Sequence, residues 1–97
     1  MPVYLVKHTH AAENCPTNNP EMVQQLANHM TQENADKYGV KLKADWVDET
    51  EHTAVFILEA DSPDKVTNFA LPFLQVGSLM IKPGLTCELV AKEALGE

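Results

Sequence analysis

Arginine is absent from this sequence, and its seven basic residues are all lysines, against fourteen acidic residues and a net charge of −7. Proteins that bind phosphate or nucleic acid usually carry basic clusters and favour arginine, because its planar guanidinium donates two parallel hydrogen bonds to phosphate. The sequence has no such cluster. We therefore expect no nucleic acid and no membrane among its partners, and we assign the acidity to solubility.

Long apolar runs are also missing, and cysteine is scarce. No stretch approaches the roughly 20 apolar residues of a membrane-spanning helix. The opening MPVYLVKHTH has neither the charged start nor the long apolar centre of a signal peptide. We expect a cytoplasmic protein, in which two distant cysteines, Cys15 and Cys87, do not imply a disulfide.

The chain is short but has the composition of a folded protein. Its 97 residues, 44% of them hydrophobic, predict a single domain spanning residues 1–97. A domain of this size can bury only a modest core, and this favours association with a second copy.

Periodicity and turn residues predict the order strand, helix, strand, strand, helix, strand, followed by a short terminal helix. This order predicts a ferredoxin-like βαββαβ fold of the α+β class, with a four-stranded antiparallel sheet and two helices on one face. Pro72 should bend or end the second helix. The expected strands are Val3–Thr9, Val40–Val47, Thr53–Ala60 and Gly77–Pro83, and the expected helices are Pro20–Lys37, Pro63–Phe73 and a segment after Thr86.

The third predicted strand, Thr53–Ala60, is apolar on both faces. One face can pack against the helices, but the other needs a cover. A homodimer that docks sheet against sheet is one solution, and the chain's own C-terminal tail is the other. Strict alternation also predicts that Trp46 shares a face with Val40 and Leu42 and fills the core.

Two stretches, ADWVDETEHTAVFILEADSPDKV and FALPFLQVGSLMIKPGLT, resemble a group of small bacterial proteins classed as domains of unknown function. The resemblance implies a dimeric, ferredoxin-like α/β barrel. Some relatives of that group bind nickel through histidines at the end of the first strand, where this chain has His8 and His10. The loop AAENCPTNNP is not part of the pattern.

His8 and His10 are two residues apart on a predicted strand, so their side chains should project from the same face and could share a metal ion. The first and third strands are antiparallel neighbours in the predicted fold, and this brings His52 to the same end of the sheet. Cys15 follows in the loop. The alternatives are histidines that are hydrogen-bonded or face solvent and a loop cysteine with ordinary chemistry.

We therefore predict a transition-metal-binding protein with ligands among His8, His10, His52 and Cys15. The resemblance favours nickel as the ion, and the ligand types also permit copper or zinc. An isomerase or cofactor-free oxygenase that uses His8 or His52 as acid and base is the alternative, and a module for assembly alone is the third. The sequence contains no G-x-S-x-G, P-loop or H-E-x-x-H motif. We place Cys87 in the core and His29 on the surface.

Overall fold

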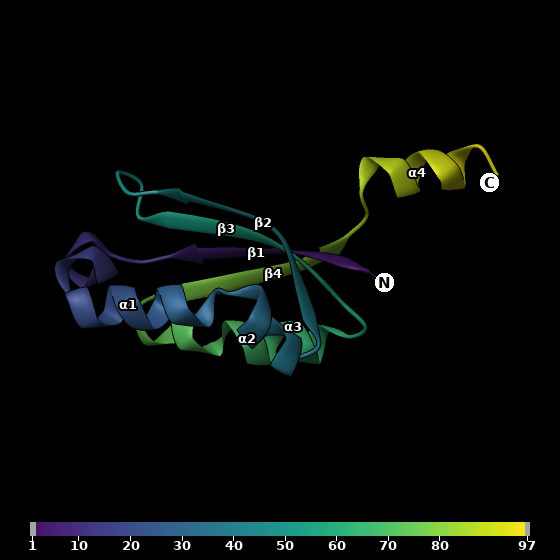
Figure 1. Cartoon of the computed structure of the whole chain (residues 1–97). Coiled ribbons are helices and arrows are strands. Elements are labelled where there is room, and N and C mark those ends of the chain that lie inside the picture. The colour runs from purple at the N-terminus through teal and green to yellow at the C-terminus, as the bar shows by residue number, and fades with distance from the viewer. Residues whose placement is uncertain (1, 97) are drawn as a thin grey trace.

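The structure is a computed structural model that describes residues 2–96, so Met1 and Glu97 of the predicted domain lie outside the described residues. The described residues form a four-stranded antiparallel sheet with helices packed on one face (Figure 1). The strands are β1 (Val3–Thr9), β2 (Val40–Asp48), β3 (Thr53–Ala60) and β4 (Ser78–Gly84). The sheet order is β2-β3-β1-β4, so β1 lies between β3 and β4. The predicted α+β class and antiparallel sheet are confirmed.

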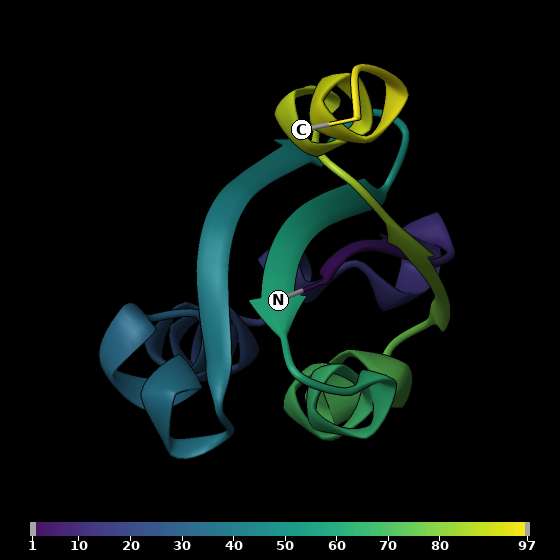
Figure 2. The same ribbon diagram turned by 90° about the vertical axis from the view of Figure 1, so that its right-hand side faces the viewer.

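The core lies between the sheet and three helices, α1 (Pro20–His29), α2 (Gln32–Lys37) and α3 (Pro63–Ala70). Figure 2 shows these helices beneath the curved sheet. Alternation along each strand sends every second side chain into this layer. We call the helix-covered side of the sheet the inner face and the opposite side the outer face. The largest fully buried side chains are Val6, His8, Leu58, Val66 and Phe69.

The predicted helix Pro20–Lys37 is broken into α1 and α2, which corrects the sequence interpretation. Met30 ends α1, and Thr31 caps α2 by accepting a hydrogen bond from the Asn34 amide at 3.1 Å. The Asn34 side chain also donates to the His29 carbonyl oxygen at 2.9 Å. These side-chain bonds satisfy backbone groups that would otherwise be unpaired at the break.

The prediction that His29 is a surface residue is wrong, because its side chain packs against α3. Its ring stacks on Phe69, with ring centroids 4.7 Å apart, and its Nε2 is hydrogen-bonded to the Phe69 carbonyl oxygen. The Asn34 side chain is 3.0 Å from its Nδ1. His29 therefore joins α1 to α3 as a packing residue, and its ring nitrogens already have partners.

A β-bulge in β2 overturns the prediction that Trp46 fills the core. The register shifts between Leu42 and Ala44, which makes Lys43 an extra residue in β2. Each β2 side chain after Lys43 therefore lies on the face of the sheet opposite to the one that strict alternation predicts. Trp46 then pairs with Val55 on the outer face and is 54% exposed. The Lys43 ammonium lies at the surface, 3.8 Å from the Glu59 carboxylate.

The C-terminal helix α4 (Cys87–Ala94) forms as predicted, and Thr86 caps it by accepting from the Leu89 amide at 3.2 Å. Figures 1 and 2 show α4 on the outer-face side, beyond the end of the sheet. All of its residues are exposed, so the prediction that Cys87 is a core residue is wrong. For the same reason, α4 does not cover the outer face. The radius of gyration, 14.6 Å, exceeds the roughly 13 Å of a compact chain this long because α4 projects.

Pro72 ends α3 as predicted, and the chain continues as a 3₁₀ helix, Leu71–Gln75, before β4. Within residues 2–96, no helix has the length and apolar character required to cross a membrane.

Candidate metal centre

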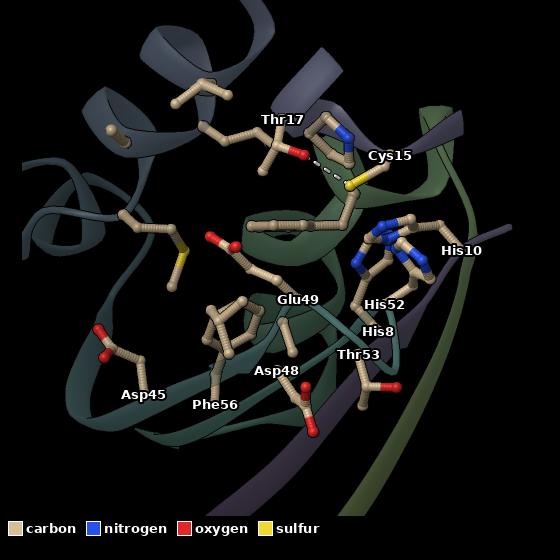
Figure 3. A pocket seen from close by; sticks show the side chains of 18 residues that line it. His8, His10, Cys15, Thr17, Asp45, Asp48, Glu49, His52, Thr53 and Phe56 are labelled. Carbon is tan, nitrogen blue, oxygen red and sulfur yellow. Dashed lines mark hydrogen bonds between the residues drawn. The ribbon is translucent and has the colours of Figure 1, made fainter. Parts of the chain in front are cut away.

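Three side chains from distant parts of the sequence meet at one end of the inner face. They are His10 just after β1, Cys15 in the following loop and His52 just before β3. One ligand atom from each lies within 4.8 Å of the others. Figure 3 shows the imidazoles gathered on one side of a cavity with the Cys15 sulfur beside them. Two nitrogens and a sulfur at this spacing are donors that a transition-metal ion can bind together.

His8 and His10 lie on the same side of the chain, as their spacing predicts, but at different depths. His8 pairs with Ala54 across β3 and is 2% exposed, whereas His10 lies one residue past the strand end and is half-buried. Their ring centroids are 5.2 Å apart. His8 also contacts the Phe73 ring, with centroids 5.2 Å apart. His8 is therefore a buried neighbour of His10, Cys15 and His52 but does not belong to the group whose ligand atoms lie within 4.8 Å of one another.

His52 reaches the site through an unusual backbone conformation. Its φ is +51°, in the left-handed region that residues other than glycine seldom adopt. Its carbonyl oxygen accepts a hydrogen bond from the His10 amide at 3.1 Å, which ties the turn before β3 to the end of β1. The ring centroids of His10 and His52 are consequently 5.3 Å apart.

Cys15 is held between two short 3₁₀ turns, Ala12–Asn14 and Pro16–Asn18. The Cys15 amide donates a hydrogen bond to the Ala12 carbonyl oxygen in the first turn, and the Cys15 carbonyl oxygen accepts one from the Asn18 amide at 3.0 Å. The loop thereby directs the thiol inward, where it is buried and lies 2.9 Å from the Thr17 hydroxyl. No local pattern indicates this burial, because the loop sequence is only a cluster of turn-forming residues.

The most informative feature of the site is a set of buried nitrogens that lack partners. Among the residues that the structure describes, His8 Nε2, both ring nitrogens of His10 and His52 Nδ1 are buried without a hydrogen bond. Native proteins rarely leave buried polar atoms unsatisfied, since each costs about 1–3 kcal/mol. A bound cation would satisfy such nitrogens, and the thiol beside them supplies a further donor.

Burial and mutual repulsion favour the neutral forms of the two β1 histidines. Desolvation lowers the pKa of His8, and the nearby His10 lowers it further, while a backbone hydrogen bond with Phe73 opposes both. The pKa of His10 is lowered by desolvation and then by His52. Neutral imidazole is the form that ligates a metal, so the site is prepared for binding at neutral pH.

The carboxylates near the site are not part of the group. The Asp48 carboxylate accepts hydrogen bonds from the Thr50 hydroxyl, the Thr50 amide and the Glu51 amide, at 2.6, 3.0 and 3.2 Å. These bonds lower its pKa. Asp48 therefore stabilises the hairpin turn, and Asp45 lies across the cavity from the histidines (Figure 3).

The histidines and Cys15 line the inner end of a cavity of about 290 Å³ between the sheet and α1. Its other walls are largely apolar and come from Val23, Leu26, Ala27 and Met30 on α1, and from Ala54, Phe56 and Phe73. The walls of this cavity therefore come from both layers of the fold.

Gly77 lets the chain pass close to the histidines. A Cβ at this position would lie 2.8 Å from His8 Nε2, 2.9 Å from His10 Cβ and closer still to the Thr9 carbonyl oxygen. Only glycine fits there without displacing the site. A glycine directly before β4 is the sequence signal for such a close approach.

A protein-family model described as "Domain of unknown function (DUF3303)" matches residues 3–95. The comparison with curated proteins gave no match. Neither comparison shows a relation to nickel-binding proteins, so nickel stays a prediction from the resemblance.

Proposed function

The chain belongs to the DUF3303 family, and we propose that it is a small metal-binding protein that holds a transition-metal ion through His10, Cys15 and His52. The observation that carries this proposal is the set of buried imidazole nitrogens without partners next to a buried thiol. His8 lies beside His10, and we propose that it either packs against the ligands or is a further ligand.

The donor set narrows the ion. Two imidazoles and a thiolate suit borderline and soft ions, which include zinc, copper and nickel, and they suit calcium and magnesium poorly. Nickel remains the first candidate because of the family resemblance, with zinc and copper as alternatives. A reducing compartment keeps such a thiol free to ligate, which is consistent with the proposed cytoplasmic location.

Calorimetric titration of the metal-free protein with Ni²⁺, Cu²⁺ and Zn²⁺ tests the proposal. We expect the variants His10→Ala, His52→Ala and Cys15→Ser each to weaken binding of the preferred ion at least about tenfold, which is about 1.4 kcal/mol. Cys87→Ser is the matched control, because Cys87 is exposed on α4. With Co²⁺ as a probe, sulfur-to-metal charge-transfer absorption should appear in the wild type and in Cys87→Ser and be absent from Cys15→Ser.

The proposal fails if the wild type binds none of these ions more tightly than the His10→Ala/His52→Ala double variant. Affinity should also fall as the pH drops below about 6.5, since protonated imidazole cannot ligate a metal.

A small-molecule enzyme of the dimeric α/β-barrel kind is the second candidate. The cavity and the buried His8 at its inner end favour it. In this alternative His8 or His52 is the acid and base of an isomerase or a cofactor-free oxygenase. Turnover that persists in thoroughly chelated protein and is lost in His8→Gln would support it over the metal site.

We also propose that the protein is a homodimer of the ferredoxin-like, α/β-barrel type. The outer face has no cover within the described chain and carries an apolar group of five side chains. In addition, α4 projects on the same side with apolar residues exposed, including Leu89 and Val90. A second copy docked on the outer face would cover both surfaces. The apolar side chains on the outer face are Leu5, Trp46, Val55, Ile57 and Met80.

A further inference from the structure

We propose that the cavity beside the metal centre binds a small, uncharged, largely apolar molecule that carries one hydroxyl group, with the hydroxyl oxygen completing the coordination of the ion. This inference rests on the proposed metal site and adds the class of molecule that the site receives. Three features of the cavity lead to it: its size, the identity of its inner end and the charge of its mouth.

The size and walls of the cavity set the size and polarity of the ligand. About 290 Å³ is near the lower end of the roughly 300–1,000 Å³ of ligand pockets, so the cavity suits a molecule smaller than a drug-sized ligand. One wall is the α1 surface that contains Leu26, Ala27 and Met30, and the facing wall is the sheet at Phe56. Such walls favour an aromatic ring or a short branched chain and give no hydrogen bonds to a polar body.

The inner end of the cavity supplies the polar anchor. Three protein ligands leave a further position on a tetrahedral ion, which is the arrangement of ion sites that bind exogenous molecules. Because His10, Cys15 and His52 all line the cavity, an atom of a molecule inside it can reach that position. The buried nitrogens without partners lie at this end and nowhere else along the cavity wall within residues 2–96. The ligand therefore needs one coordinating group at one end.

The charge at the mouth limits the rest of the molecule. Asp45 and Glu49 line the outer part of the cavity and are exposed, and the whole chain carries a net charge of −7. These carboxylates repel an anionic body, such as a phosphorylated metabolite or a dicarboxylate. A single hydroxyl satisfies both constraints, because it is neutral in solution and its oxygen coordinates a metal once bound.

The test uses the full chain loaded with Co²⁺ and the probe 4-fluorophenol, with fluorobenzene as the matched molecule that lacks the oxygen. Binding is followed by the ¹⁹F resonance, which paramagnetic Co²⁺ broadens at close range, and by the visible Co²⁺ spectrum. We expect 4-fluorophenol to bind at least tenfold more tightly than fluorobenzene and to change the Co²⁺ spectrum. Chelation should remove this preference.

Two α1 variants locate the bound probe. Ala27→Phe places a ring in the cavity from an exposed helix position and should weaken 4-fluorophenol binding at least tenfold while leaving the Co²⁺ titration unchanged. Asn28→Phe, at the next position and outside the cavity wall, should bind the probe like the wild type.

The outcomes separate this inference from the proposed function. If the loaded protein binds both probes equally or neither, or if Ala27→Phe binds 4-fluorophenol as the wild type does, this inference is overturned and the metal site stands. If the protein takes up no metal, the proposed function is overturned and this inference with it.

Discussion

The amide of His10 donates a hydrogen bond to the carbonyl oxygen of His52 at 3.1 Å, and this bond joins the two segments that carry the candidate ligands. His10 follows the end of β1 and His52 precedes β3, so the bond extends the pairing of these strands by one step. The two imidazoles therefore have a fixed backbone separation before any ion binds. Such preorganisation reduces the loss of conformational freedom on metal binding.

The left-handed backbone at His52 allows ligand loss to be separated from backbone strain. We expect His52→Gly to abolish most metal affinity while unfolding at the same or a slightly higher urea concentration, because glycine adopts φ = +51° freely. His52→Ala should lose the same affinity and be less stable than His52→Gly by about 1 kcal/mol. Urea unfolding in chelator measures the stability. Equal stability of the two variants would contradict the role given to this conformation.

Gly77→Ala should damage both the fold and the site. The added Cβ would meet the Thr9 carbonyl oxygen, His8 Nε2 and His10 Cβ, so the chain must move apart at the inner end of the cavity. We expect a loss of about 1–3 kcal/mol in the free energy of unfolding, as for other overpacked sites, together with weaker metal binding. Gly84→Ala is the control, since a Cβ there meets nothing within 4 Å. Similar effects at the two glycines would show that the close approach at Gly77 is unimportant.

The metal-free protein should lose stability as the pH falls below about 6.5. The pKa of His8 and of His10 is lowered by burial, so in this range the unfolded chain takes up protons that the folded chain does not. Protons bound preferentially by the unfolded state favour unfolding, and stability is therefore greatest above the ordinary histidine pKa. The measurement is urea unfolding in chelator at about pH 7.5 and about pH 5.5.

His8→Leu provides the variant for this pH dependence. It should show a smaller loss of stability between the two pH values than the wild type, because one of the two shifted groups is gone. A pH dependence as steep as that of the wild type would remove His8 as a source of the effect.

Trp46→Glu should convert the proposed dimer into a monomer. The substitution places a charge among the apolar side chains of the outer face, where burial against a partner would be costly. Light scattering after size exclusion at micromolar protein gives the mass. Leu74→Glu is the control, because Leu74 is similarly exposed but lies in the 3₁₀ segment after α3, away from the outer face. A wild type that is already monomeric would overturn the dimer proposal.

Local patterns in the sequence determined much of the fold and the relative placement of His8 and His10. The alternation in β1 places His8 and His10 on one side, because strand side chains repeat every two residues. Capping residues also act locally, and the side chains of Asn19 and Thr86 accept amides at the starts of α1 and α4 as their positions predict. Proline likewise ended α3 where the sequence placed it.

Contacts between distant segments decided the rest, and local patterns cannot encode them. The bulge at Lys43 is a property of the pairing between β2 and β3, and it moved Trp46 from the core to the outer face. Cys15 was a candidate ligand from the sequence, but its place next to His10 and His52 depends on how its loop packs against the end of the sheet. The sequence by itself supplied the ligand types and the shared face of the β1 histidines. Only the tertiary structure set their distances and burial, because these depend on how strands and loops far apart in the chain pack together.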